Sequence, residues 1–206
     1  MVASTFERAA DAIVAVGRAF DARGWAPATS GNYSARLDDG SFAVTVSGRH
    51  KGRLTRDDVM RVDAGGAPLD GKRPSAETAL HLSLYRRFPE VGAVLHSHSP
   101  QAVALSRLLG TDWAIRGHEL VKAFPGIVTH AAEIVLPVVD NSQDMGEIEA
   151  AIAPHIAREA PPPAYLIRGH GLYGWGRDIA EAERVIEAAE WLAACEVAER
   201  SMRREA

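Results

Sequence analysis

Apolar side chains recur at helical spacing near both ends of the chain. The stripe near the N-terminus ends before Gly24 and consists of Phe6, Ala9, Ala10, Ile13, Val16 and Phe20. The stripe near the C-terminus follows Asp178 and consists of Ile179, Ala182, Val185, Ile186, Ala189, Leu192, Ala193 and Val197. Because residues three and four apart lie on one face of a helix, both segments are predicted to be amphipathic helices that cover a core.

Between these helices, strand-like and helix-like segments alternate. Short apolar runs, most of them rich in Val and Ile, predict strands over residues 41–47, 91–98, 133–139 and 164–167. Helical patterns predict helices over residues 74–89, 100–109 and 145–159, with a further turn of helix over 119–124. A glycine-rich segment, residues 169–176, follows the last strand. With no internal repeat and no long linker, the sequence predicts one α/β domain over residues 1–206.

The composition limits the classes of partner. The formal net charge of -4 over 206 residues gives no basic surface that would neutralise a nucleic-acid backbone, so nucleic acid is not an expected partner. No stretch approaches the ~20 apolar residues of a membrane span, and the N-terminus lacks the pattern of a signal peptide, so no membrane is expected either. The single cysteine, Cys195, excludes a disulfide within the chain and fits a reducing compartment. We therefore expect a cytoplasmic protein.

Three histidines predict a metal site. His96 and His98 are two residues apart on a predicted strand, so their side chains project from the same face. His170 follows another strand between two glycines, which allow a close approach of backbone or ligand. Three neutral imidazoles suit zinc and leave one position open, as in catalytic sites, although nickel, manganese and iron accept the same ligands. The alternative for the first pair alone is a hydrogen-bonded surface pair.

Two glutamates are candidates for proton transfer. Glu77 lies at the start of a predicted helix, where the helix dipole favours its ionised form, and the alternative is a plain capping carboxylate. Glu119 lies beside Leu120 and near Phe124, and apolar surroundings would raise its pKa towards that of a general acid. The alternative is a solvated glutamate at a helix start. The spacing alone does not choose between them, and His81, inside a helix, is expected to be structural or solvent-facing.

Two short segments rich in hydroxyls and glycine are candidates for holding a phosphate. They cover residues 29–34 and 45–52 and are expected to be loops, in which backbone N–H groups can converge on an anion. A helix start at Ser75 would add further donors. Each segment alone is more often an ordinary turn. The candidate phosphate-binding residues are Gly31, Asn32, Ser47, Gly48, Lys51 and Ser75.

Taken in order, these motifs resemble the class II aldolase and adducin-like family. They are Thr29-Ser30-Gly31-Asn32, Ser47-Gly48, Pro74-Ser75-Ala76-Glu77, His96-Ser97-His98 and Gly169-His170-Gly171. The resemblance implies an α/β/α sandwich around a mainly antiparallel sheet, and a homotetramer with sites between subunits. It also implies one zinc ion per subunit on the three histidines and a phosphorylated sugar as the substrate. Where family aldolases have a second serine, this chain has Ala76, so the resemblance does not carry that phosphate contact over to this chain.

Three segments most resemble the branch of this family that dehydrates 5-methylthioribulose 1-phosphate to 2,3-diketo-5-methylthiopentyl 1-phosphate in methionine salvage. They are residues 47–52, 118–122 and 168–176. The resemblance implies a hydro-lyase in which Glu119 transfers the proton, whereas Glu77 would do so in the aldolase branch. The alternatives are a sugar-phosphate aldolase or epimerase, and a non-catalytic adducin-like interaction module that lacks the metal. The intact histidines argue against the last alternative.

Overall fold

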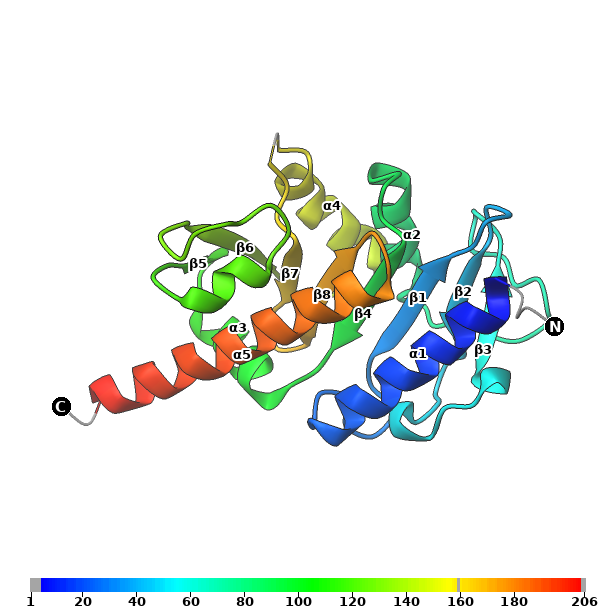
Figure 1. Ribbon diagram of the computed structural model, residues 1–206, viewed down its shortest axis with the longest axis horizontal. Helices are drawn as coiled ribbons and strands as arrows, with labels where there is room; N and C mark the ends of the chain where they lie inside the picture. Colours follow the sequence, from blue (N-terminus) through cyan, green and yellow to red (C-terminus); the bar gives the residue numbers. More distant parts are fainter. Residues whose placement is uncertain (1–4, 159, 205–206) are drawn as a thin grey trace.

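The computed structural model describes residues 5–158 and 160–204, and eight strands within them form one sheet (Figure 1). Their order across the sheet is β3-β2-β1-β4-β8-β7-β6-β5. Neighbouring strands are antiparallel except for the parallel pair β6 and β7. The strands are β1 Asn32–Arg36, β2 Phe42–Thr45, β3 Val59–Val62, β4 Ala93–Ser97, β5 Asp112–Ile115, β6 Ile134–Val139, β7 Ala164–Ile167 and β8 Gly171–Gly176.

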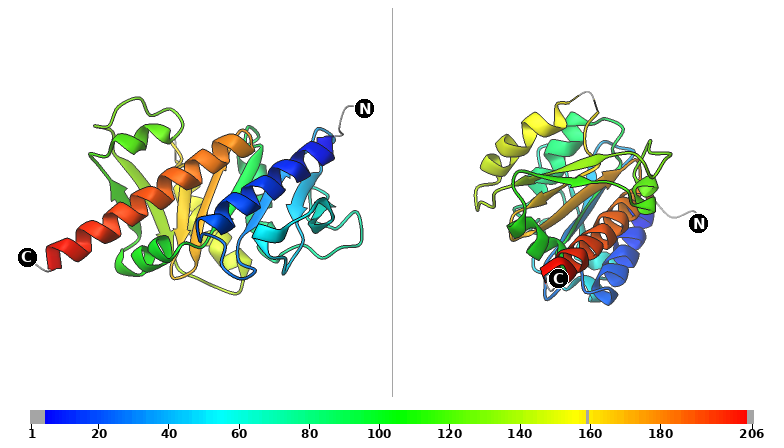
Figure 2. Two further views of the ribbon diagram at one scale, coloured as in Figure 1. Left: turned by 60° about the horizontal axis from the view of Figure 1, so that its bottom comes forward. Right: turned by 90° about the vertical axis from the view of Figure 1, so that its left-hand side faces the viewer.

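Helices cover both faces of this sheet, as the two views in Figure 2 show. Side chains of α1, α3 and α5 pack with one face of the strands in a first apolar core. Side chains of α2 and α4 pack with the other face in a second core. These helices are α1 Thr5–Ala22, α2 Thr78–Arg87, α3 Pro100–Leu108, α4 Met145–Ile156 and α5 Ile179–Arg204. The predicted α/β/α sandwich around a mainly antiparallel sheet is therefore confirmed.

Three short 3-10 helices complete the described chain: η1 Lys51–Arg53, η2 Arg56–Asp58 and η3 Glu119–Ala123. The last of these is the turn of helix predicted over residues 119–124. None of the helices in the described part of the chain is long and apolar enough to cross a lipid bilayer.

The polar and glycine-rich segments differ most from the prediction. Asn32 begins strand β1, so the expected loop over residues 29–34 ends at Gly31. The glycine-rich segment is largely strand β8, which is fully buried. Glycine is needed there because a Cβ atom at Gly171 would lie 2.2 Å from the carbonyl oxygen of Ser97 on the neighbouring strand. Close packing between strands therefore explains why this strand has a glycine-rich composition like that of a loop.

Helix α2 begins later than the proline pattern predicts. Its first residue is Thr78, and Glu77 is its N-cap, but the Glu77 carboxylate accepts no hydrogen bond from the helix backbone. Pro74 instead forms a β-bridge with Val46, so that residues 73–76 run beside the end of β2. The carboxylate of Glu77 is thereby free to point across the sheet, and the interpretation of Glu77 as a plain cap is wrong.

Candidate functional site

The three predicted histidines meet at one end of the central strands. His96 lies on β4, His98 follows that strand, and His170 lies in the turn between β7 and β8. One ring nitrogen of each lies within 4.8 Å of the others, which places three potential ligand atoms around one point. His96 is fully buried, whereas the other two rings are partly exposed. This group is called the histidine cluster below.

The hydrogen bonds of the cluster fix which nitrogens face inward. Nδ1 of His96 donates to the carbonyl oxygen of Leu172 at 3.0 Å, and Nδ1 of His170 donates to Oδ1 of Asn141 at 3.1 Å. In neutral rings, Nε2 of both residues then carries a lone pair. These two Nε2 atoms are 3.4 Å apart with no proton between them. A cation would satisfy both, so the donor set fits a metal ion held by oriented imidazoles.

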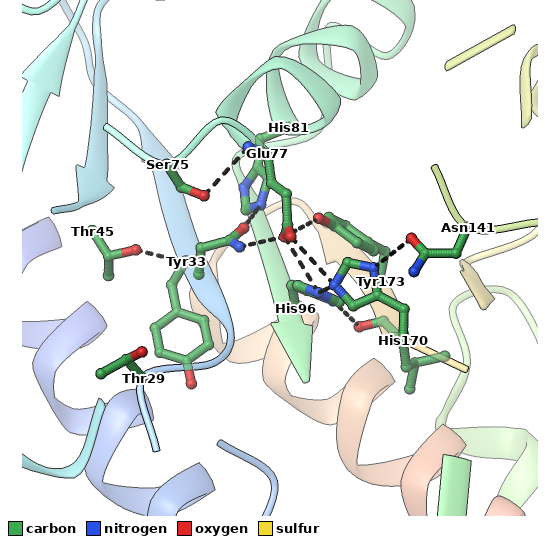
Figure 3. A network of polar contacts seen from close by, with 12 residues as sticks. Thr29, Tyr33, Thr45, Ser75, Glu77, His81, His96, Asn141, His170 and Tyr173 are labelled. Atoms are coloured by element: carbon green, nitrogen blue, oxygen red, sulfur yellow. Dashed lines mark hydrogen bonds and ion pairs between the residues drawn. The ribbon is translucent and has the colours of Figure 1, made fainter. Parts of the chain in front are cut away.

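Glu77 adds a carboxylate to the same point, as Figure 3 shows. Its Oε2 lies 3.4 Å from Nε2 of His96, and its Oε1 lies 3.3 Å from Nε2 of His170. Oε2 also accepts hydrogen bonds from Nδ2 of Asn32 at 2.6 Å and from the hydroxyl of Tyr173 at 2.7 Å. The carboxylate is thus held beside the histidine cluster by groups from two strands.

The electrostatics of the site favour neutral rings of His96 and His98 and an ionised Glu77. Burial lowers the pKa of His96 well below its ordinary value, and burial together with the neighbouring His170 lowers the pKa of His98 to about 4. Burial alone would raise the pKa of Glu77, but hydrogen bonds and nearby positive charge outweigh it, so this pKa lies well below its usual range. The groups that lower it are, in order of effect, His170, His96, Tyr173 and Asn32.

Lowering the pH is expected to destabilise the metal-free protein. Burial lowers the pKa of His81 to about 4, and His98 behaves alike, so the unfolded chain binds protons below about pH 6.5 that the folded chain does not. Stability is then complete above about pH 6.5 and falls towards pH 4, by at most about 1.4 kcal/mol per pH unit for each group. Urea unfolding at about pH 7.5, 6 and 5 measures this, and equal free energies at all three would contradict it.

A cavity of about 280 Å³ opens beside the histidine cluster. Its walls include His98 and Glu77, so the cavity and the cluster are continuous. The residues that the sequence assigned to phosphate binding also line it: Gly31, Asn32, Ser47, Gly48, Lys51 and Ser75. The structure therefore brings all six together, although they come from three separate segments of the chain.

Strand pairing explains how these segments meet. Asn32 is the register partner of His96, so the end of β1 lies beside the histidine cluster. The backbone N–H of Ser47 donates to the carbonyl oxygen of Arg73 at 3.0 Å, which holds the turn containing Ser75 against the end of β2. Gly31 has a φ of 79°, and a Cβ atom there would lie 2.8 Å from the carbonyl oxygen of His96. Glycine is required at this position.

Lys51 is the buried cation of the cavity. The residue is 2% exposed, and its Nζ donates to the carbonyl oxygens of Thr29 at 2.9 Å and Arg49 at 2.7 Å. An ammonium has three N–H donors, so one remains for a ligand. Burial lowers the pKa of Lys51 to about 8, and the amine is still largely protonated at pH 7. The cavity thus offers a fixed positive charge close to several hydroxyls.

Glu119 lies apart from the histidine cluster. Its side chain is 71% exposed and forms ion pairs with Lys122 and His130. A hydrogen bond from Lys122 is the main reason that the pKa of Glu119 is lowered. The expectation that apolar surroundings raise this pKa is therefore wrong for the single chain. Glu119 lines a different hollow, together with Trp191 of α5.

The sequence did not reveal two residues of the site. Tyr173 stacks on His96, with ring centroids 3.9 Å apart, and donates to Glu77. Asn141, after β6, orients His170. Once residues 171–176 are assigned to a strand that pairs with β4, the register places Tyr173 opposite His96. No comparable pattern in the sequence indicates Asn141.

Comparison with known proteins identifies the family. A model of the class II aldolase and adducin N-terminal domain matches residues 11–197. A methylthioribulose-1-phosphate dehydratase of Methylococcus capsulatus is 52% identical over 187 residues, which cover 91% of this chain and 92% of that protein. The dehydratase of that name from Marinobacter nauticus is 50% identical over 202 residues, which cover 97% of each chain.

Solved structures give the same result for the fold. The l-fuculose-1-phosphate aldolase of Thermus thermophilus superposes with a TM-score of 0.76 at 28% identity, and the match covers 95% of this chain and 96% of that one. A putative aldolase/epimerase/decarboxylase of Escherichia coli superposes with a TM-score of 0.77 at 30% identity, and the match covers 90% and 86% of the two chains. This chain therefore belongs to the class II aldolase and adducin family.

Proposed function

We propose that this protein is a zinc-dependent hydro-lyase that converts 5-methylthioribulose 1-phosphate to 2,3-diketo-5-methylthiopentyl 1-phosphate in methionine salvage. The observation that carries the proposal is the junction of the histidine cluster with a cavity lined by Lys51, hydroxyls and glycine N–H groups. Such a site suits a small sugar with a phosphate at one end. Two relatives about half identical to this chain are named for this reaction. We place the protein, one domain over residues 1–206, in the cytoplasm.

The cavity and the histidine cluster would bind different parts of the substrate. The phosphate would lie in the cavity against Lys51, Ser47 and Ser75, which leaves the sugar carbons beside the histidine cluster. When bound to His96, His98 and His170, zinc would supply Lewis-acid polarisation of the sugar oxygens. The buried face of β4 and the rings around it exclude water from one side of this position.

Two proton transfers complete the dehydration. One proton leaves C3, and Glu77, ionised beside the histidine cluster, is placed to accept it. Another proton must reach the departing hydroxyl of C4 so that it leaves as water, and we assign this transfer to Glu119. The enol that remains tautomerises to the diketone. The C3–H and C4–O bonds break, a carbon–carbon double bond forms, and no oxidant is needed.

Glu119 would have to come from another copy of the chain. Within one chain it is exposed and its described ion pairs are with Lys122 and His130, neither of which lines the cavity. A homotetramer with sites between subunits, which the family resemblance implies, would place one subunit's Glu119 at the histidine cluster of its neighbour.

Product analysis tests the reaction. The purified, metal-loaded protein is incubated with 5-methylthioribulose 1-phosphate, and the products are followed by mass spectrometry and by the absorbance of the diketone. The proposal predicts a product that has lost one water. Two carbon fragments would assign the protein to the aldolases, and an isomer of unchanged mass to the epimerases. An unchanged substrate with no bound metal would favour the adducin-like interaction module.

Replacing Lys51 with methionine is expected to weaken substrate binding. The methionine keeps most of the buried volume but removes the charge, and a hydrogen bond to a charged group contributes roughly 1.5–3 kcal/mol, or about ten- to a hundredfold in KM. Lys72→Met is the matched control, because Nζ of Lys72 also donates to two carbonyl oxygens, those of Asp57 and Val59, outside the cavity. Steady-state kinetics of both variants checks this. Equal KM values for both variants would contradict the phosphate role.

A further inference from the structure

A continuous line of hydrogen bonds runs from Glu77 into the protein interior. Asn32 Nδ2 contacts Glu77 Oε2 at 2.6 Å, and Asn32 Oδ1 accepts a short hydrogen bond from His81 Nε2. His81 Nδ1 lies 2.7 Å from the hydroxyl of Ser34, and that hydroxyl lies 2.8 Å from the hydroxyl of Tyr85. Asn32, Ser34, His81 and Tyr85 are all at least nine-tenths buried. Figure 3 shows His81 behind Glu77, away from the histidine cluster.

The ionised carboxylate at one end sets the direction of every bond in this line. Glu77 can only accept, so Asn32 must turn its NH₂ group towards it and its oxygen towards His81. The Asn32 oxygen can only accept, so His81 must carry its proton on Nε2. The buried ring is neutral, so Nδ1 accepts from Ser34, whose own oxygen then accepts from Tyr85. One arrangement of protons satisfies all five residues.

We propose that His81 is a positioning residue of the active site, which fixes the side-chain amide of Asn32 so that an N–H donor is held on Glu77 and into the substrate cavity. His81 neither lines the cavity nor belongs to the histidine cluster, and its hydrogen bond towards the site is to Asn32. Without His81, the side-chain oxygen of Asn32 would be buried with no hydrogen-bond donor. Rotation of the amide towards another donor would then lower its free energy. This inference rests on the proposed function only for its effect on turnover.

A merely structural role makes a different prediction. His81 is packed edge-on against Tyr173, with ring centroids 5.6 Å apart, so any replacement removes packing and lowers stability. A positioning role additionally depends on which nitrogen of the ring is imitated. Glutamine can present an N–H where Nε2 lies, and asparagine can present an oxygen where Nδ1 lies. Glutamine therefore keeps the donor to Asn32, whereas asparagine keeps only the acceptor for Ser34.

Two variants of the metal-loaded protein separate these roles. His81→Gln is expected to keep kcat within about threefold of the wild type, whereas His81→Asn is expected to lose roughly ten- to a hundredfold, as when the partner of an active-site group is removed. Bound metal should be unchanged in both, and their melting temperatures should fall alike. Ser83→Ala, which removes another buried hydroxyl on α2, is the control for stability loss alone. Equal losses of kcat in both His81 variants would overturn the proposal.

An NMR measurement without substrate determines which ring nitrogen of His81 carries the proton, and hence which atoms donate along this line of hydrogen bonds. In ¹⁵N-histidine NMR spectra of the metal-loaded wild type, the signal that disappears in His81→Gln should belong to a neutral ring protonated on Nε2. A ring protonated on Nδ1, or a charged ring, would overturn the proposal whatever the substrate is. If the wild type fails to turn over 5-methylthioribulose 1-phosphate, the proposed function fails, and this spectrum still tests the role of His81.

Discussion

His96→Ala is expected to abolish stoichiometric metal binding and to lower turnover by more than about 10³-fold. Its Nε2 faces His170 and Glu77, so the variant removes a proposed central ligand from the histidine cluster. Lewis-acid stabilisation is worth several kcal/mol, and each 1.36 kcal/mol corresponds to a factor of ten in rate. Metal analysis of the purified protein and steady-state kinetics measure both effects.

Replacing the buried His96 also lowers the stability of the fold, so a second variant is needed. His170→Ala changes a partly exposed residue in a turn and should give the same loss of metal with less effect on folding. His155→Ala on α4 is the control, because that side chain lies outside the cluster and contacts Arg158. Full metal content in both cluster variants would contradict the assignment of the ligands.

Glu119→Gln is expected to lower turnover by roughly 10²–10⁴-fold with no change in bound metal. A positioned acid contributes this much to a rate, and glutamine keeps the shape of the side chain but cannot supply the proton. Glu77→Gln is the comparison, because Glu77 lies at the histidine cluster of the same chain. If Glu119→Gln turns over at near the wild-type rate while Glu77→Gln is inactive, the acid is Glu77.

Mixed oligomers test which subunit supplies Glu119. His96→Ala and Glu119→Gln chains are each expected to be inactive, but a shared site in a mixed oligomer can combine intact histidines from one chain with an intact Glu119 from its neighbour. Random mixing would restore about one quarter of the sites. Co-expression of the two variants and measurement of turnover per chain checks this. No recovery in verified mixed oligomers would show that Glu119 does not act across subunits.

The elements that the sequence predicted are those in which a single pattern dominates. Helices α1 and α5 follow continuous apolar stripes, and β4 and β6 are apolar runs, so local spacing was sufficient. Four strands, β1, β3, β5 and β8, were not predicted, and the composition of β8 is set by contacts with a neighbouring strand. Gly171, for example, is a glycine because the backbone of β4 approaches it closely.

The same division applies to the site. The sequence predicted His96, His98 and His170 as one group, and the structure places one ring nitrogen of each within 4.8 Å of the others. Tyr173 and His81 depend on the pairing of strands and on a helix packed behind them, which no local pattern encodes. The proposed role of Glu119 follows neither from a local sequence pattern nor from contacts within one chain. The proposal puts its contact with the substrate in a site shared with another subunit.

A zinc titration tests the central claim most directly, namely that dehydration depends on an ion held by the histidine cluster. The protein is stripped with a chelator, zinc is added back in steps, and bound zinc and the conversion of 5-methylthioribulose 1-phosphate to the diketone are measured at each step. We predict that turnover is lost with the metal and returns in proportion to bound zinc, reaching its maximum at about one ion per chain. Full turnover by protein that retains no metal would contradict the account.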